Sequence, residues 1–179
     1  MARNELNVAE QREVRNIKNI GNTGPMSNSN FDAQPWFDDL YPGFMVTSQP
    51  RFVPEREIVD FARLWDPQPY HIDAEAAKSS VFGRLVGSGT HMHALTMRLG
   101  VDSNVLCGKA VLGLGLDRVR YLKPLLPDTS VAATFAVTDA RLSASRPGYG
   151  VVTWEVKLLD EAGEAIYSAV LANLYRRRP

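Results

Sequence analysis

Residues 87–100, Gly-Ser-Gly-Thr-His-Met-His-Ala-Leu-Thr-Met-Arg-Leu-Gly, contain the clearest secondary-structure pattern in the chain. Its apolar residues recur at helical spacing and form one stripe, at Met92, Leu95 and Leu99. Small residues open the segment, and Gly100 is a typical helix stop. The pattern predicts a long helix from about Ser88 to Gly100.

Two shorter helices are expected before this segment. The first runs from Pro54 to Asp66, because apolar residues recur at helical spacing up to Trp65 and the Asp66-Pro67 pair ends the run. Asp73 can cap the second helix, over Ala74–Ser80. This half of the domain is therefore expected to be helical.

The residues after position 110 show the two-residue alternation of β-strands. The expected strands are 112–122, 131–137, 152–158 and 165–175. In the first of them the apolar positions change parity between Leu116 and Val119, which predicts a β-bulge near Asp117. Helices followed by an antiparallel sheet indicate an α+β fold.

The composition fits one globular domain. The 179 residues are 45% hydrophobic and 22% charged, and no linker or repeat interrupts residues 31–179, which we expect to form a single domain. Residues 1–30 are rich in asparagine and poor in large apolar side chains. We expect them to be a disordered or loosely docked arm.

Charge and cysteine content exclude several classes of function. Twenty Lys and Arg balance twenty Asp and Glu, so the net charge of +0 offers no general attraction to nucleic acid or anionic membranes. The single Cys107 cannot form an intramolecular disulfide. No segment reaches the roughly 20 apolar residues of a membrane span, and the first residues lack the apolar core of a signal peptide. We therefore expect a cytoplasmic protein without a nucleic-acid or membrane partner.

The densest group of chemically active residues is Asp66-Pro67-Gln68-Pro69-Tyr70-His71-Ile72-Asp73. Two prolines restrict the backbone between Asp66 and His71, so both side chains can converge on one water molecule, as general acid–base catalysis requires. The alternative is structural: a helix-end acid and a turn histidine that bonds a backbone carbonyl. Composition alone leaves both interpretations open.

The glycine-rich turn before the long helix is a second candidate. Free N–H groups at a helix N-terminus, supported by the helix dipole, can bind a carbonyl oxygen as it gains negative charge. Gly89 would let a substrate approach this backbone closely, although a tight turn without chemistry is the alternative. A nucleophile elbow at Ser88 is not expected, because it needs glycine where Val86 and Thr90 stand.

Nucleotide and metal motifs are incomplete. The glycines within 108–115 lack the ending of a phosphate-binding loop. His91 and His93 are two positions apart on the expected helix, so they point apart and are not expected to share a metal. We expect both to be packing or surface residues.

Together, the two clusters resemble the MaoC-like acyl dehydratases, also called (R)-specific enoyl-CoA hydratases. The resemblance rests on the following residues, and covers about 36–176: Phe61-Ala62, Asp66, Pro69, His71, Asp73, Phe82-Gly83, the turn that opens the long helix, and the stretch from Gly115 to Asp128. It implies a hotdog fold, in which a curved antiparallel β-sheet wraps a long central helix, and a homodimer or higher homo-oligomer.

By the same resemblance, Asp66 and His71 would be the catalytic pair, and the Gly89 N–H would donate to the thioester carbonyl. The implied enzyme is a hydro-lyase of fatty acid metabolism that reversibly hydrates a trans-2-enoyl-CoA to an (R)-3-hydroxyacyl-CoA. Coenzyme A would enter only as part of the substrate, and no metal or other cofactor is expected. Alternative functions are a hotdog acyl-CoA thioesterase and a non-catalytic acyl-CoA-binding protein.

The chain departs from the family at Ser88, where many members have histidine, and at Gln68, where they have Asn or Asp. We expect Ser88, Gln68, Tyr70 and Thr90 to contact the substrate, with helix capping as the alternative role of Ser88. Trp65, Tyr70 and Met92 are candidates for shaping an acyl tunnel or for plain core packing. The Arg176–Arg178 run is expected to be a solvated strand end, with phosphates of coenzyme A as the alternative partner.

Overall fold

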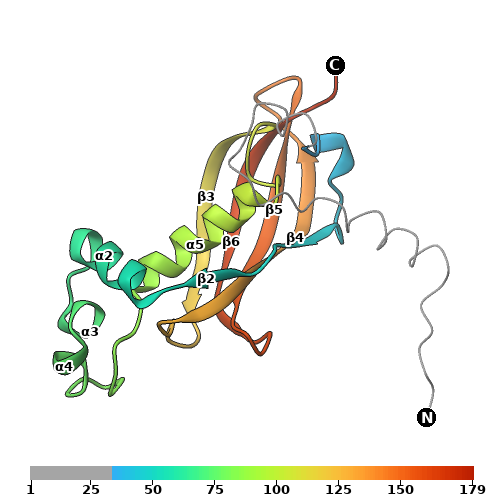
Figure 1. The fold of residues 1–179 in the computed structure, drawn as a ribbon. Coiled ribbons are helices and arrows are strands. Elements are labelled where there is room, and N and C mark those ends of the chain that lie inside the picture. The colour runs from blue at the N-terminus through green and yellow to red at the C-terminus, as the bar shows by residue number, and fades with distance from the viewer. Residues whose placement is uncertain (1–33) are drawn as a thin grey trace, which may run out of the picture.

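The computed structural model describes residues 34–179, so the arm expected at residues 1–30 lies outside the described residues. Six strands form an antiparallel sheet in the order β1-β4-β5-β6-β3, and β2 pairs with β4 beside this path (Figure 1). The strands are β1 (Met45–Thr47), β2 (Arg51–Val53), β3 (Ala110–Tyr121), β4 (Thr129–Leu142), β5 (Tyr149–Leu159) and β6 (Ala165–Arg176). The four long strands stand where they are predicted, which confirms the α+β class.

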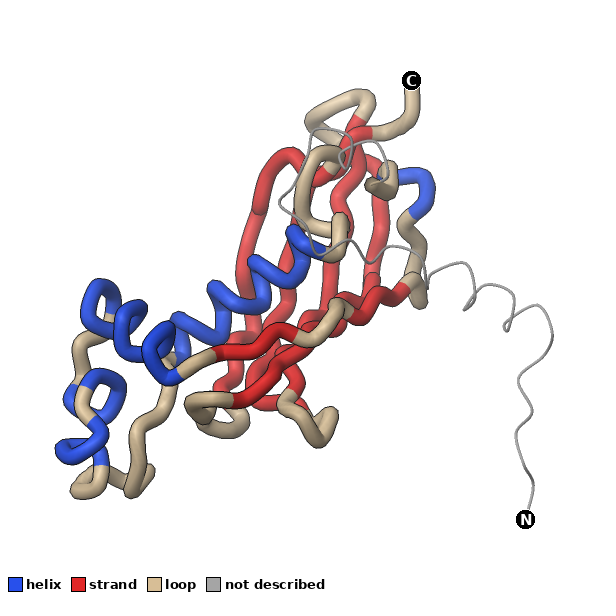
Figure 2. Tube along the Cα trace, in the orientation of Figure 1, coloured by secondary structure: helices blue, strands red, loops and turns tan. Residues whose placement is uncertain are grey.

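One face of the sheet is apolar because alternate residues of each long strand point to it. Phe135 of β4, Trp154 of β5 and Tyr175 of β6 are fully buried there. The long helix α5 (Gly89–Asp102) crosses this face (Figure 2). Its buried apolar residues join the same core, and they are the predicted stripe of Met92, Leu95 and Leu99. The arrangement is the expected hotdog fold.

The central helix is longer than predicted, because Gly100 does not end it. A methyl group on Gly100 would lie 2.5 Å from Leu106 Cδ1 and 2.9 Å from Phe135 Cε1. Glycine is therefore required there so that the helix can pack closely against the sheet and the following loop. The prediction of a helix stop at Gly100 is wrong.

The other helices lie beyond the ends of the sheet (Figure 1). They are α2 (Glu55–Trp65), α3 (Pro69–Ile72) and α4 (Ala74–Ala77) at one end, and the 3₁₀ turn η3 (Phe37–Asp39) at the other. Asp73 caps α4 as predicted, because its side chain accepts from the Glu75 and Ala76 N–H groups, although α4 ends before Ser80. Within residues 34–179, no helix is long and apolar enough to cross a membrane.

Three short elements are not predicted by the local sequence. Strands β1 and β2 have three residues each, too few to show an alternating pattern, and both depend on pairing with β4. Helix α3 has four residues and begins at Pro69, whose missing N–H costs nothing at a helix start. These elements are determined mainly by tertiary contacts.

Strand β3 contains the predicted bulge. Asp117 pairs with Val170 and Arg120 with Ser168, so β3 uses one more residue than β6 between these pairs. Arg118, inside the bulge, has a φ of 50°, in the left-handed region.

The bulge decides which side chains of β3 face the core side of the sheet. Leu116 and Tyr121 are an odd number of positions apart, yet they pair with Leu171 and Tyr167, which both belong to the core. The extra residue thus brings Tyr121 to the same side of the sheet as α5.

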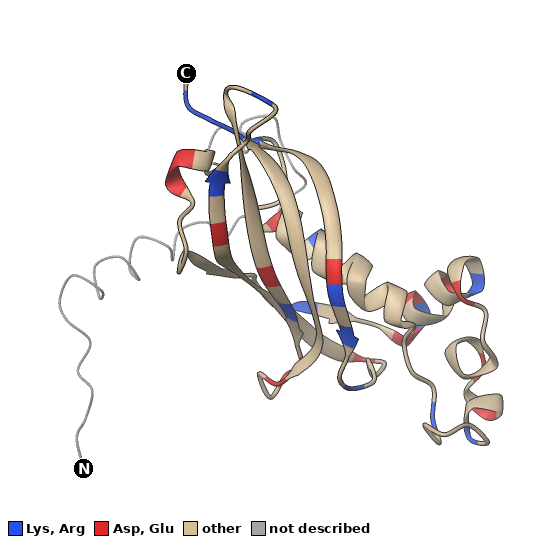
Figure 3. Ribbon diagram, turned by 180° about the vertical axis from the view of Figure 1, so that it is seen from behind, with Lys and Arg blue, Asp and Glu red and all other residues tan. Residues whose placement is uncertain are grey.

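The end of β6 is tied to η3 by charge. Arg177 pairs with Asp38 at 3.1 Å, and Arg178 pairs with Asp39. Figure 3 shows the blue C-terminal segment and the red η3 at the same end of the sheet. The expectation of a solvated strand end is confirmed, because residues 176–178 are all exposed, and two of the three arginines also form ion pairs. They also lie at the opposite end of the sheet from α2 and α3.

Candidate active site

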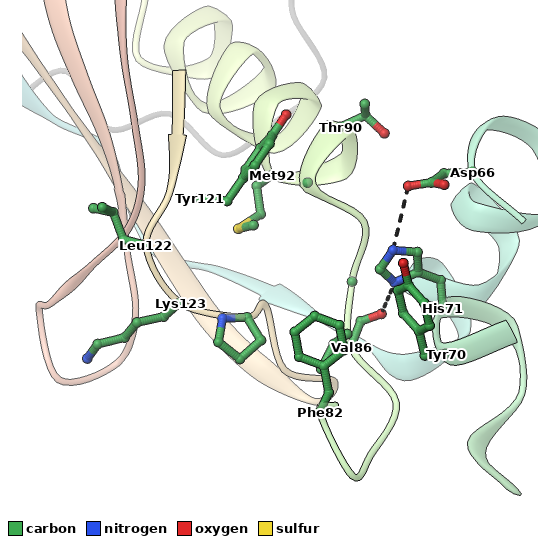
Figure 4. A pocket seen from close by; sticks show the side chains of 13 residues that line it. Asp66, Tyr70, His71, Phe82, Val86, Thr90, Met92, Tyr121, Leu122 and Lys123 are labelled. Atoms are coloured by element: carbon green, nitrogen blue, oxygen red, sulfur yellow. Dashed lines mark hydrogen bonds and ion pairs between the residues drawn. The ribbon is translucent and has the colours of Figure 1, made fainter. Parts of the chain in front are cut away.

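A cavity of about 410 Å³ lies at the N-terminal end of α5 (Figure 4). Its walls come from the end of α2, from α3, from the segment 82–90 that leads into α5, and from the end of β3. The lining residues are Asp66, Tyr70, His71, Phe82, Val86, Gly87, Gly89, Thr90, Met92, Tyr121, Leu122, Lys123 and Pro124. The volume is in the usual range for a small-molecule site.

Backbone hydrogen bonds hold the segment before α5 between two walls of this cavity. The Val86 N–H donates to the Tyr70 carbonyl at 3.1 Å, and the Gly87 N–H donates to the Leu125 carbonyl at 2.7 Å. A methyl group on Gly87 would lie 2.7 Å from Leu125 Cδ2, so glycine allows this close approach. The small-residue turn therefore connects α3 to the segment after β3.

Asp66 and His71 lie side by side in the wall of the cavity. Asp66 follows the last residue of α2, and His71 lies on α3, with 3.5 Å between His71 Nε2 and Asp66 Oδ2. The His71 side chain is 8% exposed and that of Asp66 is 30% exposed. The rigid segment through Pro67 and Pro69 brings the two side chains together, as the sequence predicts.

The partner of His71 Nδ1 determines the tautomer of the ring. Nδ1 lies 2.7 Å from the Val86 carbonyl oxygen, which can only accept, so Nδ1 carries a proton. In the neutral ring Nε2 is then an acceptor, and it faces the Asp66 carboxylate, which is also an acceptor. Two acceptors at this distance can share a donor such as water, which offers one O–H group to each of them.

Ser88 is fully buried and positions Asp66. Its Oγ donates to Asp66 Oδ2 at 2.6 Å and accepts from the Thr90 N–H at 3.2 Å, which caps α5. Because the one hydroxyl proton of Ser88 goes to the carboxylate, the Thr90 hydroxyl must donate to Ser88 Oγ, 2.7 Å away. Thr90 and Ser88 thus form a chain of donors that ends on Asp66.

Gly89 begins α5 and lines the cavity. The first N–H groups of a helix have no partner within the helix, and the helix dipole makes them good donors to a developing negative charge. A methyl group on Gly89 would lie 2.6 Å from Tyr121 Cε1. The Tyr121 ring therefore packs directly on this glycine.

The structure brings most, but not all, of the predicted site residues together. Asp66, His71, Gly89, Tyr70 and Thr90 line the cavity, as does Met92. Gln68 is exposed and does not line the cavity, and Ser88 contacts Asp66 rather than the open space. Trp65 is 72% exposed and also lies outside the lining, so it shapes no tunnel within this chain.

The wall formed by Tyr121, Leu122, Lys123 and Pro124 is not predicted by the sequence. These residues are more than 30 positions from Gly89, and the pairing of β3 with β6 and the hydrogen bond from the Gly87 N–H to the Leu125 carbonyl bring them to the site. No local pattern could identify them.

His91 and His93 have separate partners. His91 Nε2 lies 3.2 Å from Glu57 Oε1, and the His91 ring stacks on Phe61 with centroids 4.3 Å apart. His93 Nδ1 lies 2.8 Å from the hydroxyl of Tyr167, whose pKa is raised to about 12 by burial and by Tyr121. Among residues 34–179, no group of three or more His, Cys, Asp or Glu side chains could hold a metal ion.

Burial and ion pairing shift the pKa values of the His91–Glu57 pair. Burial lowers the pKa of His91, and Glu57 opposes this only in part. Burial alone would raise the pKa of Glu57, but its bonds to Arg51 and His91 outweigh burial and hold that pKa below its usual value. The pair joins α2 to α5 and therefore supports the position of Asp66 at the end of α2.

Comparison with known proteins finds relatives that are hydratases or MaoC-like proteins. The family description of the MaoC-like domain matches residues 43–158. The chain is 37% identical over 87 residues to mesaconyl-CoA hydratase of Haloarcula hispanica, which is 48% of this chain and 24% of that protein. It thus matches only about a quarter of the length of this curated relative.

Solved structures agree over a longer span. The MaoC-like dehydratase of Rhodospirillum rubrum superimposes with a TM-score of 0.76 and 33% identity, covering 81% of this chain and 99% of that one. An (R)-hydratase of Pseudomonas aeruginosa shares the fold, with a TM-score of 0.65 and 18% identity over 80% of this chain and 86% of that one. The match of more than half the chain to one domain family, with a structural relative of the same kind, shows that this protein belongs to the MaoC-like dehydratase family.

Proposed function

We propose that this protein is a hydro-lyase that reversibly hydrates a trans-2-enoyl-CoA to an (R)-3-hydroxyacyl-CoA. The observation that carries the proposal is the convergence of two acceptors, Asp66 Oδ2 and His71 Nε2, 3.5 Å apart, beside the N-terminus of α5. The names of the relatives, which are hydratases and dehydratases, support the same reaction type. The (R) configuration rests on the family likeness.

In the proposed mechanism, the Gly89 N–H donates to the thioester carbonyl oxygen and makes Cβ electrophilic. Asp66 and His71 each accept a hydrogen bond from one water molecule, and one of them takes its proton as the oxygen attacks Cβ. The side chain that took the proton then returns it to Cα, so the elements of water add across the double bond and both side chains regain their starting protonation. Dehydration uses the same groups in reverse.

Ser88 and Thr90 have supporting roles in this proposal. The Ser88 hydroxyl donates to Asp66 Oδ2, which fixes the carboxylate and leaves its other lone pairs for water. The chemistry needs no metal or redox cofactor, because polarisation comes from a backbone dipole and proton transfer from side chains. Coenzyme A takes part only as the carrier of the acyl group.

The test is to follow the absorbance of the enoyl-thioester bond with purified protein and a series of trans-2-enoyl-CoAs, beside a free-thiol assay and the Asp66→Asn variant. Loss of the band without thiol release, abolished in the variant, is the expected result. Thiol release would instead indicate a thioesterase. Binding without turnover of any thioester would indicate a non-catalytic protein and overturn the proposal.

We also propose that the protein is a homodimer that pairs along strand β3. Among the described residues β3 pairs only with β6, so its other edge presents free backbone groups. Its apolar side chains Val111, Leu112, Leu114 and Leu116 are 38–48% exposed. A second copy of the same edge would cover both the backbone groups and the apolar side chains.

The expected cytoplasmic location stays a prediction.

A further inference from the structure

The charges around the cavity indicate which acyl groups it accepts. We propose, on the basis of the proposed function, that the site takes uncharged acyl chains and discriminates against enoyl-CoAs whose acyl group carries a second carboxylate. The Haloarcula relatives are named for such a substrate, mesaconyl-CoA. The substrate inferred for this chain therefore differs from the one for which those relatives are named.

The walls of the cavity are mainly apolar. They are formed in large part by the side chains of Tyr70, Phe82, Val86, Met92, Tyr121, Leu122 and Pro124. Such walls stabilise an alkyl chain, whereas a carboxylate placed against them loses its hydration without gaining a partner. A cation that is free to pair with it would stabilise an additional carboxylate there most strongly.

Among the described residues of this chain that line the cavity, Lys123 is the single Lys or Arg, and its ammonium group already has carboxylate partners. Its ammonium group pairs with Glu164 and lies 3.7 Å from Asp160 Oδ2, in the turn between β5 and β6. Figure 4 shows its Nζ pointing away from Asp66 and His71. The side-chain hydrogen bond to Glu164 raises the pKa of Lys123, as expected for an ammonium group that is held by a carboxylate.

Besides Lys123 and His71, the other acidic or basic side chain among these lining residues is Asp66, which the proposed mechanism uses as a carboxylate. Water attacks Cβ beside Asp66, so a carboxylate attached to Cβ would approach a like charge as well as apolar walls. Both effects oppose a dicarboxylic acyl group. A methyl or alkyl group at the same carbon meets neither.

The test compares fumaryl-CoA and crotonyl-CoA, which carry a carboxylate and a methyl group on Cβ and are otherwise alike, with mesaconyl-CoA as a third substrate. We expect kcat/KM to favour crotonyl-CoA by at least about tenfold. Equal or faster hydration of fumaryl-CoA or mesaconyl-CoA would overturn the inference and leave the proposed function standing. Failure to hydrate these three and every longer trans-2-enoyl-CoA would overturn both.

A variant can test the role assigned to Lys123. Glu164→Gln removes one partner charge, while Asp160 is kept because its Oδ1 accepts from the Ala162 and Glu164 N–H groups that shape the turn. We expect the fumaryl-to-crotonyl ratio of kcat/KM to rise about threefold or more, with crotonyl-CoA turnover unchanged.

The matched control is Glu161→Gln in the same turn. It removes the same charge, but the Glu161 carboxylate accepts from the Ser130 N–H, whereas Lys123 pairs with Glu164 and Asp160. The ratio should stay at its original value in this variant. An equal rise in both variants would mean that net charge, rather than the pairing of Lys123, controls the ratio, and the assignment of Lys123 would be withdrawn.

Discussion

At the residue scale, Asp66 accepts the Ser88 hydroxyl and lies 3.5 Å from His71 Nε2. Asparagine in its place keeps the shape and can still accept from Ser88, but it cannot take a proton from water. We expect Asp66→Asn to lower kcat by at least about a hundredfold while the melting temperature stays close to that of the original protein. The enoyl-thioester assay and a thermal melt measure both quantities. A soluble variant with most of its activity would contradict the role of Asp66.

Thr90 gives a second prediction at this scale. Its hydroxyl donates to Ser88, which in turn donates to Asp66. Thr90→Val has nearly the same shape without the hydroxyl, so we expect kcat to fall about tenfold, with a smaller change in KM.

Thr90→Ser restores the donor and is the matched control. It should recover most of the lost kcat. If valine and serine behave alike, the Thr90 hydroxyl does not position Asp66. If only KM changes, Thr90 contacts the substrate instead.

The residue scale also shows why the acid–histidine pair could be predicted and its neighbours could not. The spacing of Asp66, His71 and the prolines between them is local, and it is sufficient to bring the pair together. The hydrogen bond from Ser88 to Asp66 spans 22 positions, and the Tyr121 wall depends on the sheet. Neither leaves a pattern in the neighbouring sequence.

At the scale of elements, the first turn of α5 must approach Tyr121 closely. Gly89→Ala would place a methyl group 2.6 Å from the Tyr121 ring. We expect the ring or the helix start to shift, with a loss of at least about tenfold in kcat/KM, because the Gly89 N–H, the proposed donor to the thioester carbonyl, moves with it. Steady-state kinetics on one enoyl-CoA would measure the loss.

Gly113→Ala is the control for a glycine-to-alanine change. The nearest atom to its added methyl group is 3.9 Å away, on Asn173, so activity should persist. Normal activity of Gly89→Ala would show that the start of α5 does not need glycine.

The contact between α2 and α5 predicts a pH dependence of stability. Because burial lowers the pKa of His91, the unfolded chain takes up a proton near pH 6.5 that the folded state resists. The free energy of unfolding therefore falls as the pH falls through that value. Glu57, whose pKa is lowered, adds a further loss as the pH falls below 4.5.

His91→Gln should make the fall in melting temperature between about pH 7.5 and pH 5.5 shallower. Some slope should remain, since burial also lowers the pKa of His93. Thermal melts across this range provide the measurement. An unchanged slope would mean that His91 does not contribute to the acid sensitivity.

Elements are predictable where their own residues determine them. The stripe of α5 and the alternation of the long strands are local patterns, and the structure confirms both. The predicted end of α5 is misplaced because Gly100 serves packing against Leu106 and Phe135, which no helix-stop rule includes. Strands β1 and β2 exist because β4 offers them an edge.

At the scale of the whole molecule, strand β3 predicts the state of assembly. Leu114→Lys places a charge on the exposed apolar edge, so we expect the dimer to dissociate to a monomer of 19.9 kDa. Light scattering after size exclusion distinguishes the two masses.

Met45→Lys is the matched control, because Met45 is 54% exposed on β1, at the opposite edge of the sheet from β3. It should leave the mass unchanged. A monomer in the original protein, or a stable dimer of the Leu114→Lys variant, would refute pairing along β3.

The bulge at Arg118 also limits how the length of this protein can vary. Removing or adding one residue between Leu116 and Tyr121 would turn Tyr121 to the far side of the sheet and take a wall from the cavity. Changes of two residues would preserve its direction. Functional descendants of this chain are therefore expected to tolerate insertions or deletions of two residues here, but not of one. The hairpin turns between the long strands are not limited to even-numbered changes in length.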